Sequence, residues 1–232
     1  DGKWGNYFDG SGDSLSIPAD ASHQFGTGDF TVEFWVYMNS VSSDVTFVCR
    51  GQASPVVFDL FIQYRPSISN NLKVSTGVTS YVPYDFSWTP SANTWYHVAV
   101  TRAGTDLKAF IDGQQIGTTQ TDSNNMNANV TLGVGYNLPS DIQHLNGYMS
   151  NLRIVKGTAL YTSAFTPSTT PLTAISGTSL LTCQSNRFVD NSSNDHSLTV
   201  NGDPEVTPFS PFPQTTAYDA STNGGSGYMD VI

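Results

Sequence analysis

The chain has 232 residues and a formal net charge of −10, and its composition is 38 % hydrophobic but only 12 % charged. Its nine Lys and Arg residues are scattered singly, which argues against binding to nucleic-acid phosphates or to an anionic membrane surface. No apolar run approaches the roughly 20 residues that cross a bilayer, and the aromatic content excludes a disordered chain. We expect a globular protein with no nucleic-acid partner and no membrane insertion, in an extracellular or high-salt setting.

The clearest strand is predicted at 30–38, FTVEFWVYM, where every second residue is apolar and the residues between them mix polar and large aromatic side chains. This period of two predicts one face in the core and a second face that is partly covered. Strand-like runs at 44–51, 56–64 and 71–77 follow between turn residues and predict a meander.

Residues 94–119 contain the clearest sequence signals of β-hairpins. A strand at 97–102 is followed by the turn AGTD and by a partner strand at 107–111. Asp112-Gly113 then gives the signal of a type I′ hairpin turn. The residues QQIGTT, which come next, are expected to return as a further strand.

Two more strands are predicted at 129–135 and 147–157, with a polar loop of about ten residues between them. Residues 157–165 could hold one short helical turn. No long segment has apolar residues at helical spacing, so the expected fold is all-β with antiparallel connections. A two-sheet sandwich of twelve or more strands suits this length.

From residue 166 onward the sequence predicts an extended connector, two strands at 179–185 and 196–203, and a turn at 190–195. We assign residues 1–203 to the sandwich domain. Residues 204–222 are rich in Pro, Ser and Thr and are expected to be a linker or an extended strap.

The last residues of the chain repeat the sequence pattern of its first residues. GGSGYMDVI at 224–232 has the same Gly-rich lead into an aromatic residue and an Asp as GNYFDGSGD at 5–13. Residues 223–232 would therefore begin a following repeat, or add a strand to this sandwich or to a neighbouring subunit. The chain does not begin with Met and has no signal-peptide pattern, so we expect a mature product or a piece of a longer protein.

Four segments together resemble a known family. YFDGSGDSLSIP, GTGDFTVEFWVY, TWYHVAVTRAGTDLKAFIDGQQIG and LNGYMSNLRIVKGTALYT occur in this order between residues 5 and 165. They resemble the laminin-G-like, concanavalin A-like jelly-roll domains, and the closing LLTCQSNRFVDNSSNDHSLTVNG resembles the tail that follows such domains, often in tandem, in marine phage and bacterial surface proteins. The resemblance implies an antiparallel jelly-roll sandwich.

Cys49 and Cys183 are the only cysteines, and each lies in an apolar run. A disulfide would need their strands to face each other, and buried free thiols are the favoured alternative.

Catalysis is not expected. Glycoside hydrolysis needs two carboxyl groups across a cleft, but the chain has only two glutamates, Glu33 and Glu205, and no second acid on the strand of Glu33. The four histidines are spread along the chain, and His97 matches a structural position in the family.

The resemblance implies that a calcium site at one edge is common. The candidate ligands are aspartates in Gly-rich or polar loops, although Asp is also an ordinary turn residue. These candidates are Asp9, Asp13, Asp29, Asp190 and Asp195.

Sugar binding would use aromatic faces together with amide and carboxylate groups on loops. Two segments offer both, 79–88 and 135–147, and the alternative for each is that its aromatic side chains pack in the core. The candidate ligand-binding residues are Tyr81, Tyr84, Trp88, Tyr136, Asn137, Asp141, Gln143 and His144.

These observations predict a non-catalytic module on an extracellular or virion surface that binds a glycan or a cell-surface receptor. It would belong to a repetitive adhesin, fibre or tail protein and contact neighbouring repeats or subunits. The alternative is a purely structural building block with no ligand pocket, in which the 135–147 loop packs against the next subunit.

Overall fold

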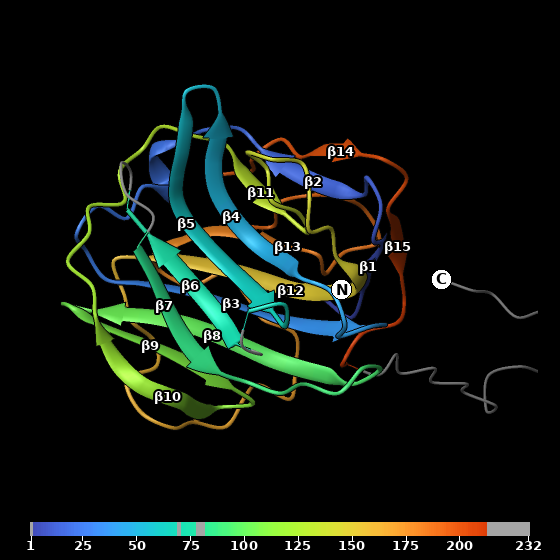
Figure 1. Cartoon of the computed structure of the whole chain (residues 1–232). Helices are drawn as coiled ribbons and strands as arrows, with labels where there is room; N and C mark the ends of the chain where they lie inside the picture. The colour runs from blue at the N-terminus through green and yellow to red at the C-terminus, as the bar shows by residue number, and fades with distance from the viewer. Residues whose placement is uncertain (1, 69–70, 78–81, 213–232) are drawn as a thin grey trace, which may run out of the picture.

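The computed structural model describes residues 2–68, 71–77 and 82–212, and these form two antiparallel sheets packed face to face (Figure 1). The expected all-β sandwich is confirmed. Within the described residues the only helical element is a 3-10 turn, η1 (Ala21–His23). None of the described residues forms a helix long and apolar enough to cross a bilayer.

The first sheet, called sheet A, is built around the long strand β12. Its order is β10 (Gln114–Thr121), β9 (Asp106–Ile111), β8 (Trp95–Ala103), β3 (Phe30–Met38), β12 (Asn146–Lys156), β1 (Gly5–Asp9) and β15 (Glu205–Thr207). A further strand, β13 (Thr178–Thr182), also pairs with β12. β1 and β13 share one edge of β12, β1 along its first half and β13 along its second.

The second sheet, called sheet B, contains the predicted meander. Its order is β14 (Thr199–Asn201), β2 (Ser14–Ile17), β11 (Leu132–Val134), β4 (Val45–Ala53), β5 (Val56–Arg65), β6 (Asn71–Thr76) and β7 (Val82–Ser87). β4, β5, β6 and β7 are consecutive neighbours, so the meander expected over 44–77 is confirmed.

The core lies between the sheets, and strand β3 shows why it forms. Its alternate residues Phe30, Val32, Phe34, Val36 and Met38 are all fully buried. The ring of Phe34 lies 5.4 Å from that of Phe47 on sheet B. Burial of such side chains stabilises the fold by about 1.5–3 kcal/mol each. The predicted inward face of this strand is therefore confirmed.

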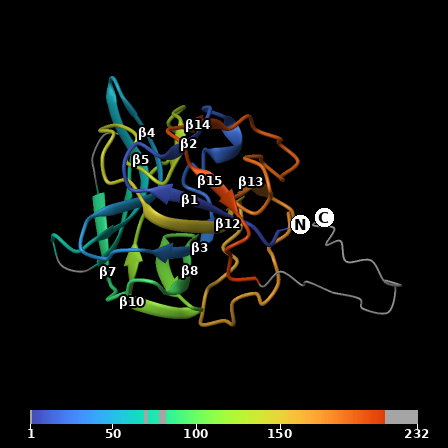
Figure 2. The same ribbon diagram turned by 90° about the vertical axis from the view of Figure 1, so that its right-hand side faces the viewer.

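The outer face of sheet A is partly covered by residues 157–176, which we call the crossover (Figure 2, orange). The helical turn predicted at 157–165 is wrong, because no helix forms there. The carbonyl oxygens of Thr158, Tyr161 and Thr162 instead accept hydrogen bonds from side chains of the sheet. These contacts hold residues 158–162 against the sheet in a conformation that is not helical.

The type I′ turn predicted at Asp112-Gly113 agrees with the structure, since both residues have positive φ, 49° and 78°. Cys49 and Cys183 are free buried thiols, and burial raises the pKa of each to about 12. Strand β15 lies in the segment that the sequence assigns to a linker or strap, and it pairs with β1 at the edge of sheet A. The proposed repeat start at 223–232 lies outside the described residues.

Candidate functional site

Three aspartates converge where β1 ends. One carboxylate oxygen from each of Asp9, Asp13 and Asp203 lies within 4.8 Å of the other two, and we call this group the acidic cluster. Asp9 and Asp203 are exposed, whereas Asp13 is buried. The carboxylate of Asp13 orders both neighbours, because it accepts hydrogen bonds from the backbone N–H groups of Asp9 (3.0 Å) and Asp203 (2.8 Å).

The geometry of the acidic cluster fits a hard cation. Calcium binds carboxylate oxygens at about 2.3–2.6 Å, so two of its ligands can lie about 5 Å apart. Among the ion pairs of the described residues, none joins a Lys or Arg to these three aspartates. The three negative charges are thus held together without a neighbouring Lys or Arg partner.

Two of the five aspartates predicted as metal ligands belong to this cluster, and the other three have structural contacts. Asp29 accepts the N–H of Gly104 (2.7 Å). Buried Asp190 accepts four hydrogen bonds from its own loop and from β13, including the N–H of Leu181 (3.0 Å). Asp195 has a positive φ of 49°, typical of a turn residue.

The 135–147 loop lies beside the acidic cluster. His144 connects the two, because its Nδ1 lies 3.4 Å from the carbonyl oxygen of Asp13 and its Nε2 lies 3.5 Å from Asp141. The ring of Tyr136 stacks on that of His144 at 5.9 Å. Burial raises the pKa of Tyr136 to about 12. The side chain of Asp141 is 81 % exposed.

Asn137 and Gln143 anchor the same loop to sheet B. Oε1 of Gln143 accepts hydrogen bonds from Thr46 (3.0 Å), Gln63 (2.8 Å) and Asn137 (3.3 Å). The side-chain amides of Asn137 and Gln143 are both used in these hydrogen bonds, and the bonds fix the shape of the loop. Asp141 and the edge of His144 are left as the groups that a ligand could reach.

The described part of the 79–88 segment, residues 82–88, is not part of this site. Tyr81 lies outside the described residues. Trp88 is only 6 % exposed and packs against Phe47 and Tyr64 in the core. The hydroxyl of Tyr84 hydrogen-bonds to the carbonyl oxygen of Thr121 and to Asp122, both at 3.2 Å. Tyr84 and Trp88 therefore make structural contacts, in line with the alternative that the aromatic side chains of this segment pack in the core.

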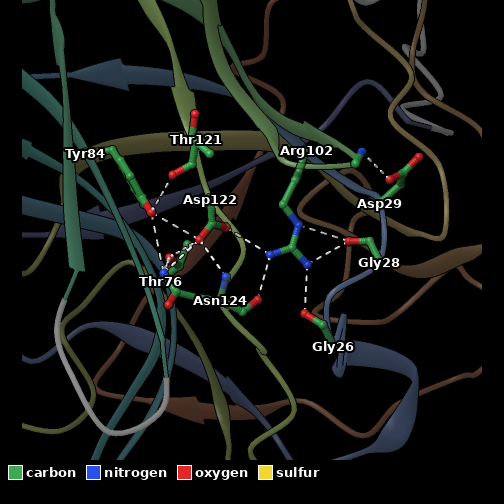
Figure 3. Close-up of polar contacts among 10 residues, drawn as sticks. Gly26, Gly28, Asp29, Thr76, Tyr84, Arg102, Thr121, Asp122 and Asn124 are labelled. Carbon is green, nitrogen blue, oxygen red and sulfur yellow. Dashed lines mark hydrogen bonds and ion pairs between the residues drawn. The ribbon is translucent and has the colours of Figure 1, made fainter.

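Asp122 and Arg102 form the centre of a buried polar network (Figure 3). Arg102 donates to Asp122 at 2.9 Å and to the carbonyl oxygens of Gly26 (2.7 Å) and Gly28 (2.7 and 3.1 Å). Asp122 also accepts from Thr76 of sheet B. Since both charged side chains are fully buried and paired, this network holds the sheets and loops together and offers no open site.

A row of aromatic side chains crosses the outer face of sheet A next to the acidic cluster. Strand register places Tyr7 opposite Tyr148, Tyr148 opposite Tyr37, and Tyr37 opposite Trp95. Neighbouring rings lie 5.0–5.7 Å apart, and we call these four residues the aromatic row. All four are half-buried, and Phe209 packs on the last three while remaining 41 % exposed.

The aromatic row and the acidic cluster meet at β1. Tyr7 and Asp9 are two residues apart on one strand and therefore lie on the same face of the sheet. Burial raises the pKa of Tyr7, and the charges of Asp9 and Asp13 raise it further. Asn146, opposite Asp9, accepts a hydrogen bond from Asn39 (2.8 Å), so polar side chains border the row.

Sequence reasoning missed Asp203 and the aromatic row. Asp203 joins the cluster only because β14 pairs with β2, which brings residues 190 positions apart together. The four rings align only through the register of β1, β12, β3 and β8. The signal that could have indicated the aromatic row is the presence of an aromatic side chain at an outward-facing position of each of these strands.

The chain's two glutamates are in different environments. Glu33 is fully buried and bonded to Arg153 (2.6 and 2.9 Å), His97 (3.2 Å) and Tyr161 (2.8 Å). Glu205 is exposed on edge strand β15. Every oxygen of Glu33 is therefore occupied by a partner beneath the crossover.

The sequence matches a family model, described as the concanavalin A-like lectin/glucanases superfamily, over residues 9–162. No curated protein matches it. A heptameric pentraxin from Limulus polyphemus is similar in structure, with a TM-score of 0.61 and 12 % identity over 88 % of this chain and 94 % of that one.

Two further solved structures share the fold. A putative carbohydrate binding protein from Bacteroides ovatus has a TM-score of 0.56 and 13 % identity over 86 % of this chain and 60 % of its own. Domain 4 of an extracellular arabinanase from Geobacillus stearothermophilus, solved with arabinotriose, has a TM-score of 0.52 and 19 % identity over 67 % of this chain and 72 % of its own.

Proposed function

Because the chain belongs to the concanavalin A-like lectin/glucanases superfamily, we propose that it is a non-catalytic module that recognises carbohydrate. The observation that carries the proposal is the meeting of the acidic cluster, the exposed part of the 135–147 loop and the aromatic row around β1. Aromatic side chains contact the C–H groups of a sugar, while carboxylate and amide groups orient its hydroxyls. The family membership alone would leave the function open.

The solved structures support the proposal only through their common fold. One is described as a putative carbohydrate binding protein, and another is a domain in complex with arabinotriose. We further propose that the module works on an extracellular or virion surface, within a repetitive adhesin, fibre or tail protein. Weak binding by one module would there be strengthened by neighbouring copies.

A calcium ion is part of the proposed site. Asp9, Asp13 and Asp203 would hold it, since their carboxylate oxygens lie within 4.8 Å of one another. When bound, calcium would supply a positive centre to which sugar hydroxyl groups can attach. The chain's own contribution is to fix the three carboxylates through the hydrogen bonds that Asp13 accepts.

The first test is a glycan-array measurement in calcium and again in EDTA, with the variants Asp203→Asn and Asp106→Asn. Asp106 is an exposed aspartate at the start of β9 and serves as the matched control. We expect binding in calcium, loss of at least about tenfold in EDTA or with Asp203→Asn, and no change with Asp106→Asn. Binding that is indifferent to EDTA and to Asp203→Asn would remove calcium from the proposal.

The aromatic row is tested separately with Tyr7→Ala and Tyr7→Phe, because Phe209 packs on the other three members of the row. Loss of binding with the alanine and retention with the phenylalanine would support stacking on the row, since only the second variant keeps the ring. A folded protein that binds no glycan under any condition would overturn the carbohydrate proposal and favour a structural building block.

A further inference from the structure

A pair of histidines joins the short turn η1 to the loop that follows β13. His23, the last residue of η1, is fully buried, and its ring lies 4.6 Å from that of His196 in the loop of residues 183–198. A hydrogen bond also joins Oγ of Ser22 to Nε2 of His196 (3.0 Å), across 174 positions of sequence. We call this contact between η1 and the 183–198 loop the histidine latch.

His23 has an unusual environment for a polar side chain. Neither its Nδ1 nor its Nε2 has a hydrogen-bond partner among the described residues, although both atoms are buried. Buried polar atoms are normally hydrogen-bonded, and a buried charge without a partner costs far more free energy than a neutral ring. The closed latch therefore accepts His23 in its neutral form and opposes its protonation.

The positively charged groups near His23 strengthen this opposition. His196 faces it from the 183–198 loop, and Arg50 faces it from β4. On β12, which also packs against η1, Lys156 donates to the carbonyl oxygen of Ala21 (2.8 Å). Burial, followed by the charges of His196 and Arg50, lowers the pKa of His23 to about 4.

The acidic groups near His23 do not reverse this effect. Asp20 caps η1 but is exposed, so water and salt screen its charge. Asp190 is buried but already accepts hydrogen bonds from its own loop and from β13. Asp59 is paired with Arg50, and β13 itself carries no titratable side chain. His23 therefore stays neutral in the closed latch at pH values where a free histidine takes up a proton.

A histidine of this kind links the latch to pH. The open latch, in which water reaches His23, binds more protons than the closed latch below about pH 6.5, the ordinary pKa of histidine. The ratio of open to closed molecules then rises about tenfold for each pH unit until the pKa of the closed form is reached. Acid thus favours the open latch by on the order of a hundredfold.

The segment that the latch holds leads to the acidic cluster. Asp190 ties the first part of the 183–198 loop to β13, so the part able to move begins near His196. The loop runs into β14, which pairs only with β2 among the described strands. Asp203 follows β14, and its N–H donates to the carboxylate of Asp13 (2.8 Å). Loosening the loop therefore loosens the position of Asp203 as well.

We infer that the histidine latch is an acid-sensitive device, which holds the end of the 183–198 loop against η1 at neutral pH and releases it in acid. The release would withdraw Asp203 from the acidic cluster. The latch goes beyond the proposed function, and only its effect on a bound glycan rests on that function. A glycan held with the help of Asp203 would bind more weakly at pH 5 than at pH 7.

Hydrogen–deuterium exchange of the full chain at pH 7 and pH 5, corrected for the intrinsic pH dependence of exchange, tests the latch. We expect the amides of residues 196–201 to open at least about tenfold more often at pH 5, while those of β3 and β12 do not change. Glycan-array binding at the same two pH values tests the link to Asp203, and equal binding despite an open latch would contradict that link.

The variants are His23→Phe, which keeps a ring but takes up no proton, and His144→Phe, which makes the same change at a half-buried histidine outside the latch. His23→Phe should abolish the acid response and fold normally at pH 7, since an apolar ring needs no hydrogen-bond partner. His144→Phe should retain the response. A response that persists in His23→Phe, or is lost equally in both variants, would overturn the inference.

An NMR titration of the wild-type histidine rings is a second measurement that needs no variant. We expect the His23 ring of the closed form to stay neutral down to about pH 4. Titration near pH 6.5 while the loop stays protected would overturn the inference and leave the glycan proposal standing. Failure of every glycan to bind would overturn the proposed function and leave the latch standing.

Discussion

The carboxylate of Glu33 shows how one residue organises the outer face of sheet A. It is fully buried beneath the crossover and bonded to Arg153, His97 and Tyr161. Burial raises the pKa of Glu33, but the hydrogen bond from His97 and the charge of Arg153 lower it by more, so the pKa lies below the usual 4.5. The charged form of Glu33 is therefore part of the folded state.

We expect Glu33→Gln to lower the free energy of unfolding by about 3 kcal/mol, because it leaves the buried charge of Arg153 without its partner. A carboxylate whose pKa is depressed by folding contributes stability that is full above its unfolded pKa and is lost as the pH falls through the folded value. The variant should therefore show a weaker decline of Tm below about pH 4.5.

The control is Glu205→Gln, which changes the chain's other glutamate on exposed strand β15. Urea denaturation at pH 7 and melting curves between pH 3 and 7 would measure both effects. Similar losses in the two variants would contradict the role assigned to the Glu33 network.

At the scale of single elements, the β9–β10 hairpin is fixed by its turn. Gly113 has a φ of +78°, and a Cβ there would lie 1.9 Å from the carbonyl oxygen of Phe165 in the crossover. Gly104, in the β8–β9 turn, has a φ of +60° but nothing within 4 Å of the same position. An alanine at Gly104 would therefore introduce backbone strain alone, whereas an alanine at Gly113 would introduce both backbone strain and a steric clash with the crossover.

Gly104→Ala is expected to cost about 1 kcal/mol of stability, which is the strain of a left-handed alanine. Gly113→Ala should cost at least about 1 kcal/mol more, because the crossover must also move away. Chemical denaturation of both variants would give the difference. Equal costs would mean that the crossover adapts freely to the added methyl group.

The elements were largely predictable from the sequence, and the site only in part. The alternation in 30–38 and the Asp112-Gly113 pair are local signals, and they correctly predicted β3 and the hairpin turn. Asp9 and Asp13 lie four residues apart in one Gly-rich segment, so a local signal was enough to predict both as metal-ligand candidates. Asp203 and the aromatic row depend on pairing between distant strands, which no local pattern records.

At the scale of the whole molecule, the fold extends well beyond the family match at residues 9–162. β13, β14 and β15 lie after it; β13 and β14 pair with strands inside it, β12 and β2, and β15 pairs with β1, which lies at its beginning. The crossover after residue 162 also supplies the carbonyl oxygen of Thr173 to Arg153 (2.8 Å). The matched segment by itself therefore lacks part of both sheets.

We expect a chain ending at residue 165 to lose cooperative thermal unfolding, because Leu180 and Leu181 no longer cover β12 and the Arg153 contact is broken. Circular dichroism melting and binding of a hydrophobic dye would detect the loss, with a chain ending at residue 212 as the control for length. A sharp transition at the same Tm in both chains would show that the late strands add no stability.

The pairing of β1 with β15 also sets how the module would respond to force. Gly5 lies opposite Thr207, so the outer ends of two antiparallel neighbours are adjacent. Tension applied at these two residues would open their hydrogen bonds one after another, like a zipper, and would not shear them all at once. In a chain of such modules, β15 would peel away at lower load than the strands that are paired on both sides, and would act as a compliant spring.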